Sequence, residues 1–512
     1  MKKRKVKKGI LIPAILLGVL AALIVTLIIV TNTQKKKEDI KVSGEIILTV
    51  NEANAKSIAW NSEENNYAFH RGPDGKWVYD KDAEFPVSQD EVTDVFNLFR
   101  DLKAAFVIEH VTDFAQYGLK DPVSVVSINT TERTEDLNSK ETQPRGEASA
   151  EGEEHTIEIH IGAFSVMDQQ RYISIGDGNV YLVKDDPYKT LNVPEKLMIQ
   201  NDRIPYFYNI YSANVVTKND SWTIGYDLEN YKEFSYARDD YYYLEKGGQK
   251  YMLDPNVSLK YFTGIVNTTL ENYVNYKVRE DELGQYGLDK PEYIMDLHTY
   301  VKNNDGTVTN IDFRLLISRD PALIARDGKE AAEGEEAPEF RAYLRKDDSK
   351  IIYELNEAQF KTLTGSDYNS LRYKAMMPAD IGDIEGIDFT VDGQTYSITS
   401  VLDDNTRTHY FNGNALNINN LKNALTSLTA DQFTDEQPDG ADELTMVFHL
   451  SSEKFPTVKV QCFRKDGDHS LVVVDDKPAA LVSRARANSL REALIKISLG
   501  NDVKETTAPA GN

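Results

Sequence analysis

Cysteine is almost absent from this chain of 512 residues: Cys462 is the only one. A single cysteine excludes an intramolecular disulfide and a zinc cluster built from cysteines. Cys462 alternates with Val458 and Val460 in a strand-like segment, so we expect it to face a core as a small apolar side chain. The chain is long enough to bury several cores without disulfides and suggests about three domains.

Positive charge is scarce outside the N-terminal segment. The net charge is −24, and residues 1–37 carry nine basic and no acidic side chains, which leaves −33 for residues 38–512. A part this acidic does not bind nucleic acid, because phosphate backbones are held by lysine and arginine. Anionic lipid surfaces repel it as well. Net charge otherwise indicates solubility and not a particular chemistry.

Long apolar runs are also scarce, and the one that matters here is residues 10–30. At 1.5 Å per residue it reaches roughly 30 Å, the thickness of a hydrocarbon core. It is too long for a cleavable signal peptide, only a poor cleavage site follows it, and no lipoprotein cysteine follows it. We therefore predict a basic cytoplasmic segment (1–9), a transmembrane helix (10–30) and a linker (31–45). The excess of basic residues before the helix predicts a single-pass protein of the cell membrane, with a cytoplasmic N-terminus and an extracytoplasmic bulk.

A seven-residue motif occurs twice in the exported part. Residues 116–122 read Gln-Tyr-Gly-Leu-Lys-Asp-Pro, and residues 285–291 read Gln-Tyr-Gly-Leu-Asp-Lys-Pro. Both copies follow β-rich runs and a helix and precede further strands. In the first copy Ser88 is a candidate N-cap for a helix that contains Val92, Val95, Phe96, Phe99 and Leu102. In the second copy the pattern predicts a helix over 257–270.

A third, more divergent copy is predicted without that motif. Residues 387–391 and 394–399 form a strand pair joined by an Asp392-Gly393 hairpin turn. A helix is expected over 416–428, and a closing helix over 486–499. Three further strands are predicted between them, at residues 445–450, 458–463 and 470–474.

These patterns predict an α+β fold of tandem repeats, each an antiparallel β-sheet with packed helices. The predicted repeats are 46–200, 201–375 and 376–500, followed by a disordered tail (501–512). Two insertions rich in Glu, Ala, Gly and Pro, 131–154 and 325–339, are expected to be mobile loops.

No residue pattern predicts catalysis, a metal site or a cofactor site. The histidines lack ligand spacing, and neither a P-loop nor a Gly-x-Ser-x-Gly elbow is present. Ser451-Ser452-Glu453-Lys454 fits Ser-x-x-Lys, but it lies before Phe455-Pro456 in an expected hairpin loop, where the helix that this chemistry needs is absent. We therefore predict a protein that is not an enzyme; a hydrolase with an unfamiliar site stays the remote alternative.

Tyrosine is abundant, with 28 residues in the chain. Two groups stand out: Tyr206, Tyr208 and Tyr211, and then Tyr241, Tyr242 and Tyr243. In a β-rich protein such residues pack across strands, and on one exposed face they stack on sugars or peptides. The sequence alone leaves both interpretations open.

The duplicated motif and a tryptophan after a glycine turn, Gly75-Lys76-Trp77, carry a family resemblance. With Ile161-Gly162 and the N-terminal anchor, they resemble domain-of-unknown-function family 4340, which occurs in tandem in bacterial membrane proteins. The residues that match the family motif, which we interpret as structural, are Tyr117, Gly118, Leu119, Pro122, Tyr286, Gly287, Leu288, Pro291 and Trp77. The second copy departs from the first by lacking the Ile-Gly pair and by having Tyr251 at the position of Trp77.

The resemblance implies a partner. Such proteins are often encoded beside a gliding-type ABC transporter, so it implies an extracytoplasmic accessory or scaffold subunit beside ABC permease and ATPase subunits. It supplies no catalytic residues. The alternative is a cell-wall or surface module that binds glycan or peptide through its tyrosines.

Overall fold

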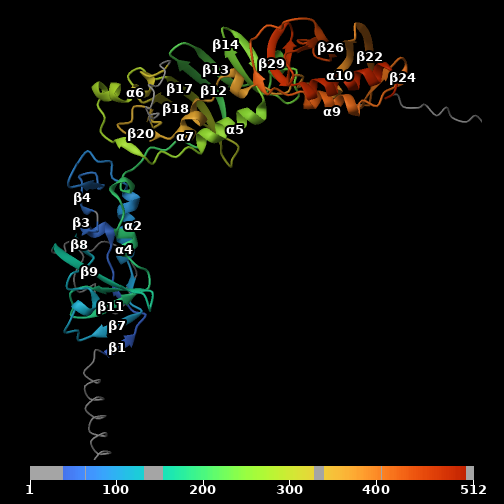
Figure 1. The fold of residues 1–512 in the computed structure, drawn as a ribbon. Coiled ribbons are helices and arrows are strands. Elements are labelled where there is room, and N and C mark those ends of the chain that lie inside the picture. Colours follow the sequence, from blue (N-terminus) through green and yellow to red (C-terminus); the bar gives the residue numbers. More distant parts are fainter. Residues whose placement is uncertain (1–38, 64, 132–153, 328–338, 405, 503–512) are drawn as a thin grey trace, which may run out of the picture. The chain divides into compact units, whose positions relative to one another are not determined.

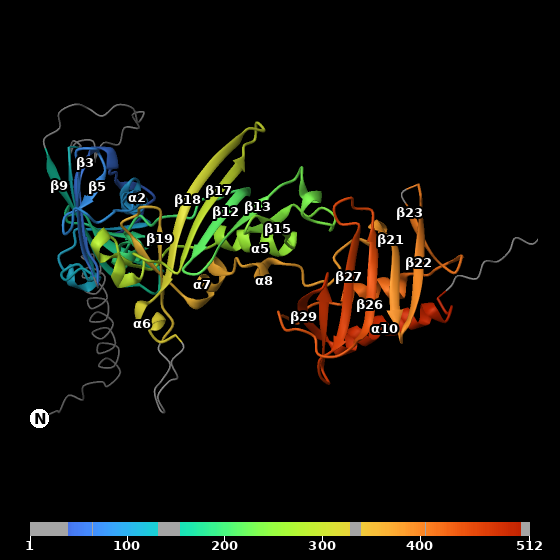
Figure 2. The same cartoon turned by 90° about the horizontal axis from the view of Figure 1, so that it is seen from above.

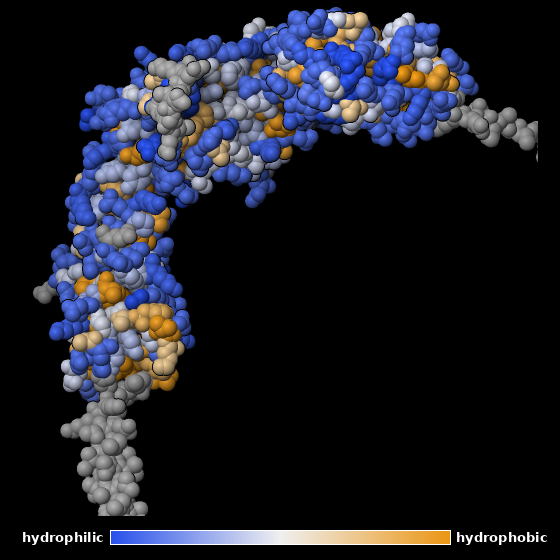
Figure 3. Space-filling model, in the orientation of Figure 1, coloured by the Kyte–Doolittle hydropathy of each residue, from blue (hydrophilic) through white to orange (hydrophobic). Residues whose placement is uncertain are grey.

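The computed structural model describes residues 39–63, 65–131, 154–327, 339–404 and 406–502 (Figures 1, 2 and 3). The chain divides into two units, Met1–Asn201 and Asp202–Asn512. The predicted transmembrane helix and most of the predicted linker, loops and tail lie outside the described residues. Within the described ranges, no helix combines the length and apolarity needed to cross a membrane.

The first unit is built on a nine-stranded antiparallel sheet with the order β1-β7-β11-β10-β9-β8-β3-β4-β5. In β8 every second side chain is buried, as expected for a strand with one face on a core. Its strands are β1 (Asp39–Val42), β3 (Ala55–Asn61), β4 (Asn66–Arg71), β5 (Trp77–Tyr79), β7 (Phe106–Glu109), β8 (Ser124–Thr130), β9 (His155–Ser165), β10 (Gln170–Ser174) and β11 (Val180–Val183).

The second unit carries two more nine-stranded antiparallel sheets. The first of these has the order β15-β14-β13-β12-β17-β18-β19-β20-β16. Helices α5 (Pro255–Val266) and α7 (Glu357–Thr364) accompany it. Its strands are β12 (Asn209–Thr217), β13 (Ser221–Tyr226), β14 (Tyr242–Lys246), β15 (Gln249–Met252), β16 (Tyr273–Asn275), β17 (Tyr293–Lys302), β18 (Val308–Arg319), β19 (Ala342–Lys346) and β20 (Ile352–Leu355).

The other sheet of this unit has the order β24-β23-β22-β21-β26-β27-β28-β29-β25. Helices α9 (Asn419–Ser427) and α10 (Arg484–Ser498) pack on one of its faces (Figure 2). Its strands are β21 (Ile384–Val391), β22 (Gln394–Asp403), β23 (Thr406–Phe411), β24 (Asn414–Ala415), β25 (Gln432–Phe433), β26 (Asp442–Leu450), β27 (Thr457–Arg464), β28 (His469–Val474) and β29 (Lys477–Ser483).

All three sheets share one strand order. In the second and third sheets, counting the strands of each from its first, the order is 4-3-2-1-6-7-8-9-5. The first sheet follows the same order from β3 onward, with three outer strands in place of four, and adds β1 beside β7. The fold is thus dominated by antiparallel sheets accompanied by helices.

The three sheets also share a β-bulge. In each sheet one central strand skips one residue in its pairing with a neighbour. The skipped residues are Lys56 of β3 beside β8, Tyr211 of β12 beside β17 and Glu385 of β21 beside β26. The bulged residue is exposed in every copy. A bulge redirects one side chain and is a recurrent feature near functional sites.

The predicted hairpin at Asp392-Gly393 is confirmed, because Val391 of β21 pairs with Gln394 of β22. Both turn residues have positive φ, 51° and 74°, as a two-residue hairpin requires. Cys462 is also confirmed as a core residue, 2% exposed. Burial raises the pKa of its thiol to about 12.

Three predicted helices are wrong at their ends. Helix α2 (Gln89–Phe99) is capped by Ser88, whose Oγ accepts from Glu91 N at 3.4 Å, but Leu102 belongs instead to β6 (Leu102–Lys103), which pairs with β2 (Ile46–Leu48). Likewise α5 ends at Val266 and α9 covers only Asn419–Ser427. The cause is shared: buried leucines just outside each helix extend the apolar period of the sequence. These leucines are Leu102, Leu270, Leu416 and Leu428.

Candidate functional site

The duplicated motif forms a tight turn against the neighbouring strands. In the first copy a 3-10 helix (Ala115–Tyr117) ends at Gly118, whose φ is +67°. A Cβ on Gly118 would lie 2.8 Å from the backbone nitrogen of Ala163, and one on Gly162 would lie 2.4 Å from the carbonyl oxygen of Tyr117. Only glycine fits at positions 118 and 162, so the motif and the Ile161-Gly162 pair contact each other closely.

The second copy repeats this geometry. A 3-10 helix (Glu280–Tyr286) ends at Gly287, with φ +68°. Leu119 and Leu288 are both buried, and Pro122 and Pro291 precede β8 and β17 by two residues. Each motif tyrosine packs on a strand tyrosine at nearly the same centroid distance, 5.0 Å for Tyr117–Tyr172 and 5.2 Å for Tyr286–Tyr343. These contacts give the motif residues a packing role in both copies.

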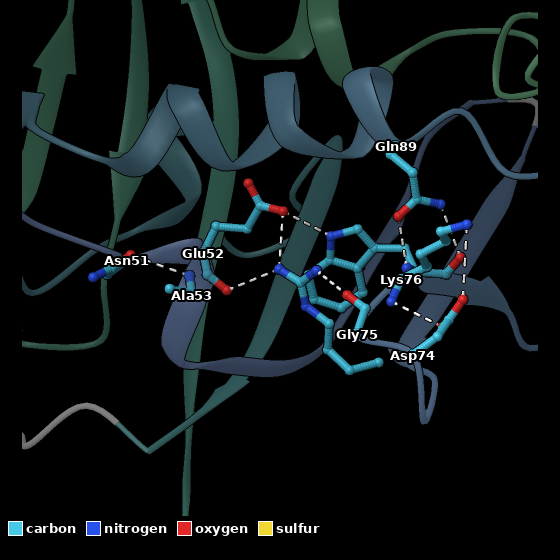
Figure 4. Close-up of polar contacts among 9 residues, drawn as sticks. Asn51, Glu52, Ala53, Asp74, Gly75, Lys76 and Gln89 are labelled. Atoms are coloured by element: carbon cyan, nitrogen blue, oxygen red, sulfur yellow. Dashed lines mark hydrogen bonds and ion pairs between the residues drawn. The ribbon is translucent and has the colours of Figure 1, made fainter. Parts of the chain in front are cut away.

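Trp77 belongs to a polar network of the first unit. The residue is 2% exposed, and its Nε1 donates to Glu52 Oε1 at 2.9 Å. Figure 4 shows Glu52 and Gln89 within this network. The guanidinium of Arg71 lies 3.9 Å from the ring centroid and also binds Glu52, at 3.0 Å. The side chain of Gln89 bonds the backbone N–H and C=O of Trp77 at 2.7 and 3.1 Å. Every polar group of this residue is therefore used within the fold.

A serine, an aspartate and a histidine lie within hydrogen-bond distance on the third sheet, but not in the order of a catalytic triad. Ser397 Oγ donates to Asp388 Oδ1 at 2.5 Å, and His449 Nε2 contacts Asp388 Oδ2 at 2.7 Å. Aspartate is central here, whereas a serine nucleophile needs the histidine between the serine and the acid. Ser451 to Lys454 lie between β26 and β27, as predicted, and Lys454 pairs with Glu233 at 3.2 Å. In the described ranges no group of three or more His, Cys, Asp or Glu side chains is placed to hold a metal ion.

Asp240 supplies a buried carboxyl in the segment between β13 and β14, within the second unit. The segment between β13 and β14 reaches the third sheet: Tyr236 packs 5.6 Å from Phe455, and Arg238 Nη2 lies 2.8 Å from Asp383 Oδ1. Asp240, in the same segment, is fully buried; Ser235 Oγ donates to its Oδ2 at 2.7 Å, and its Oδ1 has no hydrogen-bond partner. Burial raises its pKa to about 7. Arg238 also lines a cavity of about 350 Å³, whose wall does not include Asp240.

A partly exposed aromatic cluster lies at one end of the second sheet, where β12 begins and β13 and β17 end. Tyr211, the bulged residue, lies 4.8 Å from Tyr300 between ring centroids, and Tyr208 lies 6.1 Å from Tyr300. Tyr208 and Tyr211 are 54% and 49% exposed. Further rings come from the end of β13 and the segment that follows it. Tyr241 lies 5.8 Å from Tyr226 and 5.2 Å from Tyr231 between ring centroids. We call this set the tyrosine surface: Tyr208, Tyr211, Tyr226, Tyr231, Tyr241 and Tyr300.

Polar groups are interleaved with these rings. Tyr211 Oη lies 3.3 Å from Asn310 Oδ1, and Tyr241 Oη donates to Asp239 Oδ1 at 3.1 Å. The ammonium of Lys302 lies 4.8 Å from the ring centroid of Tyr208. Burial raises the pKa of Tyr300, and the neighbouring phenols of Tyr226, Tyr208 and Tyr211 raise it further. The Tyr300 hydroxyl thus stays neutral at physiological pH and can act as both donor and acceptor.

The structure brings together only part of the tyrosines singled out in the sequence. Tyr206 is 64% exposed but packs on none of the rings of this surface. Tyr242 is buried and bonds Asn209 Oδ1 at 2.9 Å, and Tyr243 packs on Phe234 at 4.9 Å. Tyr300, at the centre of the surface, was not predicted; only the strand register, which pairs Asn209 with Tyr300, shows that it lies beside Tyr211.

Comparison with known proteins gives a match to a family model. No curated protein and no solved structure matches the chain. One family model matches, "Domain of unknown function (DUF4340)", over residues 259–445. The match begins within α5 and ends within β26, so it runs from the second sheet into the third. The resemblance predicted from the sequence is confirmed over this segment, where residues 259–445 match the DUF4340 family model.

Proposed function

We propose that this chain is a non-catalytic scaffold that binds partners outside the cytoplasm. The observation that carries the proposal is the tyrosine surface. One of its exposed residues, Tyr211, occupies the bulged position that all three sheets share. The fold supplies the same bulged position three times, and the sequence fills it with Lys56, Tyr211 and Glu385. This is the pattern of a scaffold whose repeats carry different surface chemistry.

The N-terminal segment supports a place at the membrane. Residues 10–30 are uncharged and residues 1–9 are strongly basic, which favours one membrane-spanning helix with the N-terminus in the cytoplasm. Proteolysis of intact and of opened cells tests this. We expect an exogenous protease to degrade residues 46–500 in cells whose outer surface alone is exposed; protection until the cells are lysed would contradict the proposal.

The family supports a partner of the ABC-transporter type, as an accessory subunit beside its permease and ATPase. Crosslinking of the full-length protein in its native membrane, followed by mass spectrometry, tests the partnership. Recovery of a permease and an ATPase is the expected result. Recovery of neither, in a preparation where the protein itself is crosslinked, would overturn it.

A second candidate function is a module that binds glycan or peptide at the cell wall or surface. The tyrosine surface favours it, because clusters of exposed aromatic rings mark interaction sites. Retention of the full-length protein on isolated cell walls is the expected result for this candidate, and a protein that stays in the unbound fraction would exclude it.

A further inference from the structure

We propose that the tyrosine surface binds neutral carbohydrate chains. The proposal rests on the scaffold function above and adds the class of ligand and the residues that hold it. Tyr208 and Tyr211 both pack on Tyr300, and both are about half exposed, so part of each ring is accessible to a ligand. Sugars present apolar C–H faces that stack on such rings and hydroxyls that bond to their edges.

The polar groups around the rings suit hydroxyl ligands. Asn310, Asp239 and the tyrosine hydroxyls offer donors and acceptors within the same surface. A planar aromatic body with a polar tip contributes contact area at a low cost in conformational entropy. An apolar ligand would displace water from the remaining hydrogen-bonding positions of these groups without replacing its hydrogen bonds, which disfavours it.

The strand order argues against a peptide that binds by adding a strand. Such a peptide needs a free sheet edge, but β12 lies between β13 and β17, and β17 lies between β12 and β18. The backbone of Tyr300 pairs on both sides, with Asn209 of β12 and Asn310 of β18. The bulged Tyr211 is left out of both pairings, but β12 offers no edge to a further strand, so a ligand is held chiefly by side chains.

Charge argues against an anionic polymer. The chain carries a net charge of −24, and the cation next to the rings, Lys302, lies over Tyr208. A polyanion would approach against the field of the whole protein. Neutral sugar chains carry no such cost.

The test uses the full-length protein in a detergent without a sugar headgroup. Binding of N-acetylglucosamine hexamer, a soluble β-glucan and a soluble α-glucan is measured by titration calorimetry. We expect at least one to bind, and the Tyr208→Ala/Tyr211→Ala double variant to weaken that binding at least tenfold, because exposed aromatic anchors dominate such interfaces. Tyr211→Phe, which keeps the ring, is expected to retain most of the affinity.

Tyr410→Ala is the matched control: it removes a partly exposed tyrosine from β23 of the third sheet. It is expected to bind as the unsubstituted protein does. Binding of none of the three sugars, or binding that survives the double substitution in a protein with an unchanged circular dichroism spectrum, would overturn the proposal. Transporter crosslinking is measured separately, so its failure with sugar binding intact would remove only the partnership.

Discussion

Asp240 is the residue through which pH is expected to act on the second unit. Its pKa is raised from 3.8 to about 7 by burial, and the carboxyl of Asp254 adds to the rise. Because the folded state holds the proton more tightly than the unfolded state, this group stabilises the fold below about pH 4. That contribution is lost as the pH rises toward 7, at about 1.4 kcal/mol per unit of pKa difference.

We expect Asp240→Asn to remove this loss, so that the variant gains stability over the unsubstituted protein between pH 5 and pH 8. Urea unfolding at both values measures the difference. Asp239→Asn is the control, because Asp239 is the exposed neighbour. An equal pH dependence in the Asp240 variant and the unsubstituted protein would show that the carboxyl does not hold its proton in the folded state.

Gly118 allows a second prediction at the same scale, with Gly75 as its control. Both have positive φ, +67° and +79°, but a Cβ meets backbone 2.8 Å away only at Gly118; at Gly75 nothing lies within 4 Å. Gly75→Ala is expected to cost about 1–2 kcal/mol from the left-handed backbone alone. Gly118→Ala is expected to lower the unfolding free energy of the first unit by more than this, measured by denaturant titration. Equal losses would contradict the close contact with Ala163.

Among the elements, the bulge in β12 allows a surface residue to be removed without changing the packing of the strand. Ile210 pairs with Thr299 and Ser212 with His298, so Tyr211 is the extra residue. Deletion of Tyr211 keeps the register on both sides, and we expect a small change in the unfolding midpoint together with loss of sugar binding. Deletion of the buried Ala213 shifts the register by one residue, so that side chains of β12 that face the core would face solvent. We expect this deletion to abolish folding of the second unit; equal stability of the two deletions would refute the assigned bulge.

Local patterns in the sequence predicted most elements, because their signals lie within a few residues. The Ser88 cap, the hairpin at Asp392-Gly393 and the alternation around Cys462 each depend on neighbours in the chain. The tyrosine surface could not be predicted in the same way. Tyr211 and Tyr300 meet only through the pairing of β12 with β17, and the bulge that exposes Tyr211 has no sequence signal of its own. The burial of Asp240 likewise depends on how its segment packs.

For the whole molecule, the division into Met1–Asn201 and Asp202–Asn512 makes the second and third sheets one unit. We expect the fragment 202–502 to unfold in one cooperative transition, which circular dichroism measures during a denaturant titration. The fragment 202–375 is expected to unfold at lower denaturant, because Tyr236 loses its apolar partners in the third sheet. Arg238→Ala in the longer fragment is the control and costs little, since its ion pair is half exposed. Equal midpoints for the two fragments would show that the sheets are independent.

The lone cysteine has a practical consequence for spectroscopy. Because the Cys462 thiol is buried and its pKa is about 12, thiol reagents at neutral pH leave it unmodified. Any cysteine introduced at the surface becomes the single reactive thiol without prior removal of the native one. A fluorophore attached through Lys302→Cys would lie beside Tyr208, where occupancy of the rings changes its emission and can be followed in real time.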